Sequence, residues 1–252
     1  DLVLQLHWLT REVFLIIWIV IFAAWALYLF GKLTLPHDSP VTSISVGRLY
    51  LALLVSMFTL YLIPGLWGAP LQLISGFPPP MSYSESPYGV GYSKVSGILE
   101  SKIPLPDGAK YGAHDLITFI DYDKGVAYAT AQNKHILLDF TGFACVNCRR
   151  MEDKVWSQPE VLNLLREKFV IISLYVDDKK ELPEDQKYTS PTTGKEIKTI
   201  GNKWSDYQIT RYQANAQPYY IVLDSEGKDQ NKPVGYVPDV AEYKAWLESG
   251  LK

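Results

Sequence analysis

Hydrophobic residues are concentrated in two uninterrupted stretches near the start of the chain. The first covers residues 13–30 and the second covers residues 49–68, and neither contains a charged residue. Eighteen helical residues extend about 27 Å, close to the roughly 30 Å hydrocarbon core of a bilayer. The pattern predicts two transmembrane helices, with Pro64 kinking or fraying the end of the second. Two buried helices of a soluble core are the alternative, and a cleaved signal peptide is disfavoured because there are two stretches.

The charges around these stretches predict an orientation. The polar loop at residues 31–48 carries Lys32 and Arg48, whereas no Lys or Arg follows the second stretch before Lys94. The positive-inside rule therefore places the loop in the cytoplasm and both chain ends outside, although Arg11 precedes the first stretch.

Three regions follow from the composition. Residues 1–74 hold the two apolar stretches, and residues 75–112 are rich in Pro, Gly, Ser and Tyr. Such a segment builds no core, so we expect a linker, either extended or packed as irregular coil on the domain at residues 113–252. Because the chain opens at Asp1, close to the first stretch, we expect a fragment of a larger membrane protein.

After residue 115 short apolar runs alternate with helical stretches, which is typical of a compact α/β domain. The runs predict strands at 116–120, 135–141 and 169–176, and helices at 121–132, 145–155, 159–168 and 240–247. Residues 219–224 and 232–237 are expected to pair as a hairpin around residues 224–227.

Composition narrows the chemistry. The formal net charge is -3, and no Lys/Arg cluster forms a basic stripe, which argues against nucleic-acid binding. Two cysteines are too few for a disulfide scaffold, and none of the four histidines has zinc-finger spacing relative to them. Redox use of a dithiol is favoured, with no metal or cofactor.

The two cysteines form a Cys-Val-Asn-Cys motif, with Cys145 and Cys148 at a predicted strand-to-helix turn. A CxxC in this setting is typical of a thioredoxin-like redox site. The positive end of the helix dipole lowers the pKa of a thiol placed there, and the thiolate is the nucleophile. We therefore predict that Cys145 attacks a partner disulfide and that Cys148, one helical turn further on, resolves the mixed disulfide.

Acidic residues lie near this motif in the sequence. Asp139 interrupts the apolar run at 135–141, so we expect burial to raise its pKa and to let it exchange a proton with Cys148. An Asp that merely reaches water at a sheet edge is the alternative. Glu152, four residues after Cys148, shares its helical face and could join this relay or be an ordinary exposed carboxylate. Arg149 and Arg150 add positive charge, or are simply solvated.

Gln217 and Pro218 precede the apolar run at 219–223. In thioredoxin-like folds a cis-proline at this place faces the dithiol and leaves the preceding backbone free to pair with a bound peptide. Since only about 5–6% of X-Pro bonds are cis, this expectation rests on the fold and not on the dipeptide.

The sequence LLDFTGFACVNCRRMEDKVW at residues 137–156 resembles the C-terminal thioredoxin-like domain of the DsbD family of transmembrane thiol:disulfide interchange proteins. The similarity continues through Gln217-Pro218 to the chain end, and the two apolar stretches resemble the last two helices of that family's membrane domain. The resemblance implies a three-layer α/β thioredoxin-like domain with a central mixed sheet.

The resemblance also implies roles. Cys145 and Cys148 match the redox pair, Asp139 and Glu152 match acidic residues that tune it, and Pro218 matches the cis-proline. The chain departs from the family pattern at three places. First, Ala144 stands where the family usually has Trp, and Phe143 stands where it has an acidic residue. Second, the connection at 177–203 is longer than in the family. Third, the membrane dithiol and the N-terminal domain are absent. We expect Phe143, Ala144, Gln217 and Pro218 to contact the partner protein.

These observations predict a protein-disulfide reductase in the bacterial inner membrane, with its thioredoxin-like domain in the periplasm. The resemblance implies a membrane-embedded dithiol domain as electron donor and a periplasmic thiol-disulfide protein as acceptor. Two alternatives remain: a membrane-tethered thioredoxin for cytochrome c maturation, or a metal-binding CxxC protein, since paired thiolates suit soft metals. The absence of His between the cysteines favours a reductase over an oxidase.

Overall fold

The computed structural model describes residues 10–39, 43–69, 71–79, 84 and 105–251. These residues belong to two compact units. Most of the predicted linker, at 80–83 and 85–104, lies outside the described residues, as do Asp1 and Lys94. The predicted domain boundaries therefore stay predictions.

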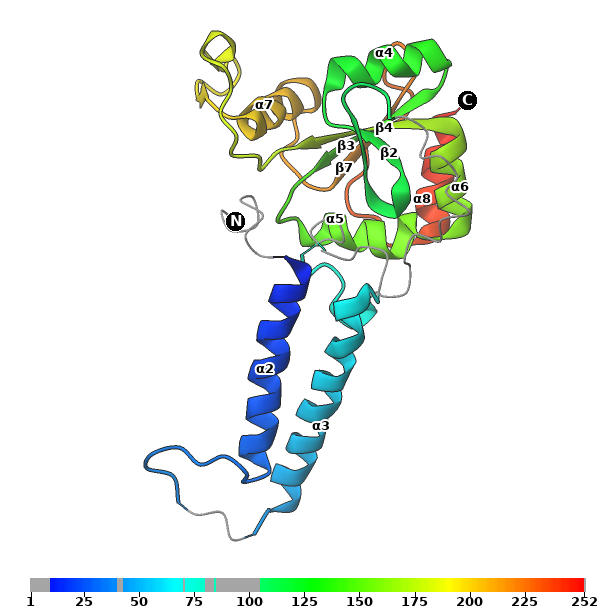
Figure 1. Ribbon diagram of the computed structural model, residues 1–252. Helices are drawn as coiled ribbons and strands as arrows, with labels where there is room; N and C mark the ends of the chain where they lie inside the picture. Colours follow the sequence, from blue (N-terminus) through cyan, green and yellow to red (C-terminus); the bar gives the residue numbers. More distant parts are fainter. Residues whose placement is uncertain (1–9, 40–42, 70, 80–83, 85–104, 252) are drawn as a thin grey trace. The chain divides into compact units, whose positions relative to one another are not determined.

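The first unit is built on two helices joined by the polar loop (Figure 1). Helix α2 spans Arg11–Leu29, and helix α3 spans Val46–Leu62 and continues as a 3₁₀ turn over Ile63–Trp67 that contains Pro64. The α-helix thus ends just before Pro64, because proline has no backbone N–H to donate to the helix. By length and composition both helices could cross a membrane.

The outward surfaces of both helices are apolar. On α2, Val20 is 60% exposed, and on α3, Met57 is 62% and Leu60 is 64% exposed. Between the helices, Phe22 and Phe58 meet edge to face with ring centroids 4.9 Å apart. The pair therefore buries one side of each helix and leaves a large apolar surface uncovered within this unit.

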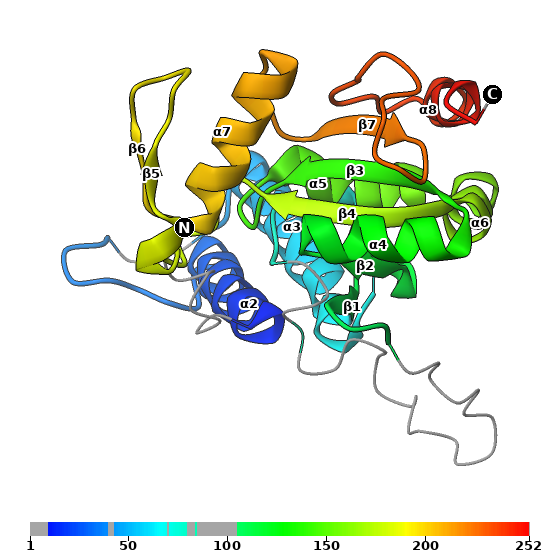
Figure 2. The ribbon, with the colours of Figure 1, turned by 90° about the horizontal axis from the view of Figure 1, so that it is seen from above.

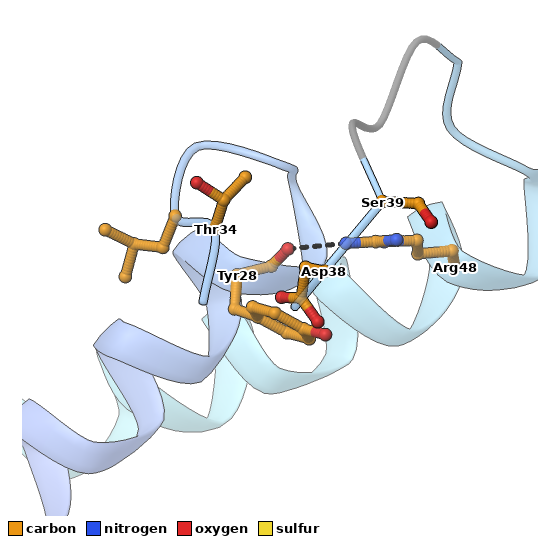
Figure 3. A pocket seen from close by; sticks show the side chains of 6 residues that line it. Tyr28, Thr34, Asp38, Ser39 and Arg48 are labelled. Carbon is orange, nitrogen blue, oxygen red and sulfur yellow. Dashed lines mark hydrogen bonds between the residues drawn. The ribbon is translucent and has the colours of Figure 1, made fainter. Parts of the chain in front are cut away.

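Arg48 closes the loop end of the helix pair (Figure 3). Its Nε donates to the carbonyl of Leu29 and its Nη2 to the carbonyl of Tyr28, both at 2.7 Å. The last carbonyls of an α-helix have no partner within the helix, so the guanidinium supplies one from the neighbouring helix. Arg48 also lies over the Tyr28 ring, 5.5 Å from its centroid.

The second unit contains a five-stranded mixed sheet in the order β1-β2-β4-β3-β7. Its strands are β1 (Ala109–Tyr111), β2 (Ile117–Phe119), β3 (His135–Thr141), β4 (Phe169–Tyr175) and β7 (Tyr219–Leu223). β3 and β4 run parallel in the centre, as do β4 and β2, while β1 and β7 are antiparallel edge strands. The predicted α/β fold with a mixed central sheet is confirmed.

Helices cover both faces of this sheet and give three layers (Figures 1 and 2). One core cluster joins the sheet to α4 (Tyr122–Gln132) and α7 (Ile200–Tyr212). The other joins it to α5 (Val146–Met151), the following π-helical turn (Glu152–Trp156), α6 (Pro159–Lys168) and α8 (Val240–Ser249). Successive residues of the central strands enter opposite clusters, as the two-residue period of a strand requires.

Two predictions of local structure are wrong. Residues 109–111, assigned to the linker, form strand β1 and pair with β2. Residues 232–237 form no second hairpin strand: only Val234 bridges Tyr220, because Pro233 has no N–H to donate. For the 177–203 connection no local structure was predicted, and it contains the short hairpin β5 (Tyr188–Thr189) with β6 (Glu196–Ile197) and the start of α7.

Candidate active site

Strand β3 positions the motif. Leu137 belongs to the core cluster on the α5 side, whereas Ile136, Leu138 and Phe140 belong to the opposite one. By alternation Asp139 faces the α5 side, and the chain leaves the sheet after Thr141. The loop that follows leads into α5, whose N-cap is Cys145.

Cys145 and Cys148 form a disulfide, so the structure represents the oxidised state. The Sγ of Cys145 accepts the backbone N–H of Cys148 at 3.1 Å, which caps the first turn of α5 with sulfur. Cys145 is 5% exposed and Cys148 is 1% exposed. Of the two, Cys145 is therefore the more accessible to a partner.

Asp139 is buried at 2% exposure in β3, the strand that leads to this motif. Its register partners are Ser173 on β4 and Tyr220 on β7, and the Ser173 hydroxyl donates to Oδ2 at 2.8 Å. Oδ1 is buried with no hydrogen-bond partner among the described residues. Burial first, and then the negative charge of Glu152, raises the pKa of Asp139 to about 7. The alternative of an Asp that reaches water is wrong.

Glu152 follows α5 directly, and its N–H donates to the carbonyl of Cys148. Its carboxylate pairs with Arg149 at 2.8 Å, with side chains that are 16% and 11% exposed respectively. Burial raises the pKa of Glu152, while the Arg149 guanidinium opposes the shift. Arg149 also donates to the Thr141 hydroxyl at 3.1 Å, so it is not simply solvated, whereas Arg150 is exposed.

Gln217 and Pro218 approach the motif from the neighbouring edge strand. β7 pairs with β3 up to Tyr219 opposite Phe140, which brings Pro218 beside the end of β3. The Gln217–Pro218 peptide bond is cis, as the resemblance implies. Pro218 is buried and Gln217 is exposed, and the Gln217 Oε1 occupies the space that a Cβ on Gly142 would need.

Phe143 and Ala144 precede the first cysteine and differ in their surroundings. Ala144 is exposed, whereas the Phe143 ring stacks on Tyr175 with centroids 4.2 Å apart. On β1, Lys110 places its Nζ 4.5 Å from the Tyr175 ring centroid and donates to the hydroxyl at 3.2 Å. Phe143 is thus part of a stack that reaches the edge strand.

Several residues that shape this site were not predicted from the sequence. Ser173 stands out as a polar residue in the apolar run of β4, and the parallel register with β3 places it opposite Asp139. Nothing in the sequence indicated a role for Lys110, because it lies in the segment that was predicted to be a linker. Asp177 also escaped notice, although its carboxylate contacts the loop before Cys145.

Within the described part of the chain, no group of three or more His, Cys, Asp or Glu side chains could hold a metal ion. The two sulfurs are instead joined to each other.

A family model described as a thioredoxin-like domain matches residues 122–251, just over half of the chain. The chain is similar to a solved structure described as DsbH oxidoreductase, with 20% identity, a TM-score of 0.38 and coverage of 52% of this chain and 81% of that one. A thioredoxin from Thermus thermophilus shows 22% identity, a TM-score of 0.36 and coverage of 50% and 81%. A thioredoxin-fold protein from Helicobacter pylori shows 24% identity, a TM-score of 0.34 and coverage of 46% and 68%. No curated protein matches the chain.

The raised pKa of Asp139 has a consequence for stability. In the unfolded chain this carboxyl ionises near pH 3.9, and in the folded chain at about pH 7, so the folded state binds the extra proton between these values. Stability is therefore lost as pH rises from about 4 to about 7, by an amount on the order of 4 kcal/mol from this group.

We expect Asp139→Asn to remove that loss, because the amide stays neutral and can still accept from Ser173. Urea unfolding of the oxidised full chain in detergent micelles measures the free energy of unfolding of the variant and of the parent protein at each pH. The difference between the two proteins should be several kcal/mol larger, in favour of the variant, at pH 8 than at pH 4.5. Asp123→Asn, at an exposed position of α4, is the matched control. An equal difference at both pH values would contradict the buried, raised pKa.

Proposed function

Because the chain belongs to the thioredoxin-like domain family, we propose that it is a membrane-anchored protein-disulfide reductase whose dithiol is Cys145 and Cys148. The observation that carries the proposal is the Cys145–Cys148 pair at the start of α5, which follows a strand with a buried carboxyl, that of Asp139, whose pKa is about 7. This arrangement combines a nucleophile with a proton acceptor suited to neutral pH.

The reaction runs in two exchanges. In the reduced protein the Cys145 thiolate attacks one sulfur of a partner disulfide, which forms a mixed disulfide and releases the other partner sulfur as a thiolate. Cys148 then loses its proton and attacks Sγ of Cys145, and the second partner sulfur leaves. Two electrons pass to the partner, both of its sulfurs take up protons, and the chain ends as the disulfide present in the structure.

Asp139 and Glu152 serve the second exchange. Cys148 is 1% exposed, so bulk water has little access to its thiol proton, and a nearby buried group must take it. Asp139 has a pKa of about 7 and exists in both protonation states near neutral pH. Glu152 influences Asp139 electrostatically and is held beside the helix by Arg149, so it completes a short proton relay.

The partner protein docks where the chain offers exposed surface around Cys145. Ala144 and the 43% exposed Val146 flank this cysteine and give an apolar contact. On the other side, Gln217 and Pro218 precede the β7 edge and would pair with an extended segment of the partner. Phe143 contributes the edge of its stack with Tyr175.

The two apolar helices would anchor this domain in the bacterial inner membrane. Their exposed apolar surfaces are suited to lipid, and the charges of Lys32 and Arg48 favour a cytoplasmic loop with the thioredoxin-like domain in the periplasm. In this arrangement, which follows the resemblance to the DsbD family, a membrane-embedded dithiol domain donates electrons. A periplasmic thiol-disulfide protein accepts them.

The reduction potential of the Cys145/Cys148 pair tests the direction of electron flow. We expect equilibration of the full chain with glutathione to give a value near that of thioredoxin, about -270 mV. A value near -120 mV, the range of the strong oxidant DsbA, would overturn the reductase assignment.

The roles of the two cysteines can be separated with a small disulfide reagent, 5,5′-dithiobis(2-nitrobenzoic acid). We expect Cys148→Ala to retain thionitrobenzoate on Cys145 as a stable mixed disulfide, because no resolving thiol remains. The matched Cys145→Ala variant should react at least tenfold more slowly, since Cys148 is the less exposed cysteine. Mass spectrometry detects the adduct, and equal rates would show that the roles are assigned wrongly.

Membrane orientation is tested by labelling introduced cysteines in spheroplasts, with Cys145 and Cys148 replaced by Ala. We expect a membrane-impermeant maleimide to label Asp185→Cys, at an exposed turn of the second unit, but to label Asp38→Cys in the loop only after permeabilisation. The reverse pattern would contradict the orientation. Labelling of both only after permeabilisation would contradict exposure of the domain to the periplasm.

A further inference from the structure

The loop that precedes Cys145 is held by a carboxylate from another strand end. Asp177 Oδ1 accepts the backbone N–H of Phe143 at 2.9 Å, and Oδ2 accepts that of Ala144 at 3.0 Å. Both oxygens therefore bind consecutive N–H groups directly before the first cysteine. Asp177 opens the 177–203 connection, to which the sequence analysis gave no role.

Asp177 lies close against the loop because Gly142 leaves room for it. A Cβ built on Gly142 would lie 2.9 Å from Asp177 Oδ2, closer than side chains tolerate. Just before it, Val176 donates to the carbonyl of Thr141 at 2.9 Å, which extends the β3–β4 pairing. These contacts fix the carboxylate relative to the end of β3.

A glycine of α7 fixes the other side of Asp177. Gly201 donates to the carbonyl of Asp178 at 2.9 Å, and a Cβ on it would lie 2.7 Å from the carbonyl of Val176. The backbone on both sides of Asp177 is therefore packed against the start of α7. The connection returns the chain to this point after the β5–β6 hairpin.

From this geometry we propose that Asp177 is a positioning residue that lowers the reduction potential of the Cys145/Cys148 pair, an inference that rests on the proposed reductase function. Its carboxylate binds the backbone N–H groups of Phe143 and Ala144, so its negative charge is fixed on the two residues directly before Cys145, whose sulfur becomes the thiolate.

The physical reason lies in the charge difference between the two redox states. The disulfide is neutral, whereas reduction by two glutathione molecules yields glutathione disulfide and a dithiol whose Cys145 ionises to the thiolate. A fixed negative charge nearby disfavours the thiolate, and N–H groups already bound to Asp177 cannot stabilise it. Since a stabilised reduced form makes a dithiol more oxidising, Asp177 acts in the opposite direction and makes the pair a better reductant.

The test is the glutathione equilibrium of Asp177→Asn in the full chain. The amide keeps the shape of the side chain, removes the charge and accepts from only one of the two N–H groups. We expect the equilibrium to shift at least tenfold toward the dithiol, which corresponds to a potential about 30 mV less negative. Alkylation of Cys145 by iodoacetamide at pH 7 should become faster, since a larger fraction is thiolate.

Asp178→Asn is the matched control, because it removes a carboxylate one residue further on, whose Oδ1 accepts from Lys180 instead. We expect its equilibrium to remain within twofold of the parent protein. If Asp177→Asn does not fold, Asp177→Ser provides the same loss of charge with a hydroxyl that can accept one N–H.

Equal potentials for the Asp177 variant and the parent protein, or equal shifts for the two variants, would overturn the role of Asp177. A parent potential near -120 mV would instead overturn the reductase function and leave the difference between variants measurable. The two failures are thus distinguishable in one set of measurements.

Discussion

The register of β3 is the constraint on which the rest of the site depends. This strand is paired on both edges, with β4 in parallel and with β7 antiparallel, and its apolar residues alternate between two core clusters. A slip of one residue would turn Asp139 to the opposite face and shift the loop that leads to Cys145. Because the apolar residues Ile136, Leu138 and Phe140 are buried at 0% exposure, such a slip would expose or displace three core side chains.

The two buried carboxyl groups of the site differ in how their negative charges are compensated. Arg149 pairs at 2.8 Å with Glu152, so one negative charge is compensated directly beside the helix. Asp139 receives only the Ser173 hydroxyl, and one of its oxygens is buried without a partner among the described residues. An uncompensated buried carboxylate is costly, so the carboxyl holds its proton until about pH 7. Asp139 and Glu152 are both acidic residues near the motif in the sequence, but their neighbours compensate the two negative charges to different extents.

The sequence predicts a strand or helix correctly where the apolar pattern or the end residues of that segment alone determine its structure. The strand at 135–141 and the helix at 159–168, which Pro159 opens, were predicted with their observed ends. Helix α7 was missed because two of its buried residues, Asp206 and Gln208, are polar and weaken the apolar period. Asp139 was identifiable as a charge within an apolar run, but the contacts of Asp177 depend on two segments more than 30 residues apart.

The stack of Phe143, Tyr175 and Lys110 determines at which residue a fragment containing the thioredoxin-like domain must begin. Lys110 lies on β1, before the residue at which the sequence first looks like a folded domain, yet its ammonium group rests on the ring that supports the loop of the first cysteine. A soluble fragment that began at residue 113 would lack this edge strand and the cation beneath the loop. An excised domain that retains the native surroundings of its dithiol must therefore begin upstream of Ala109.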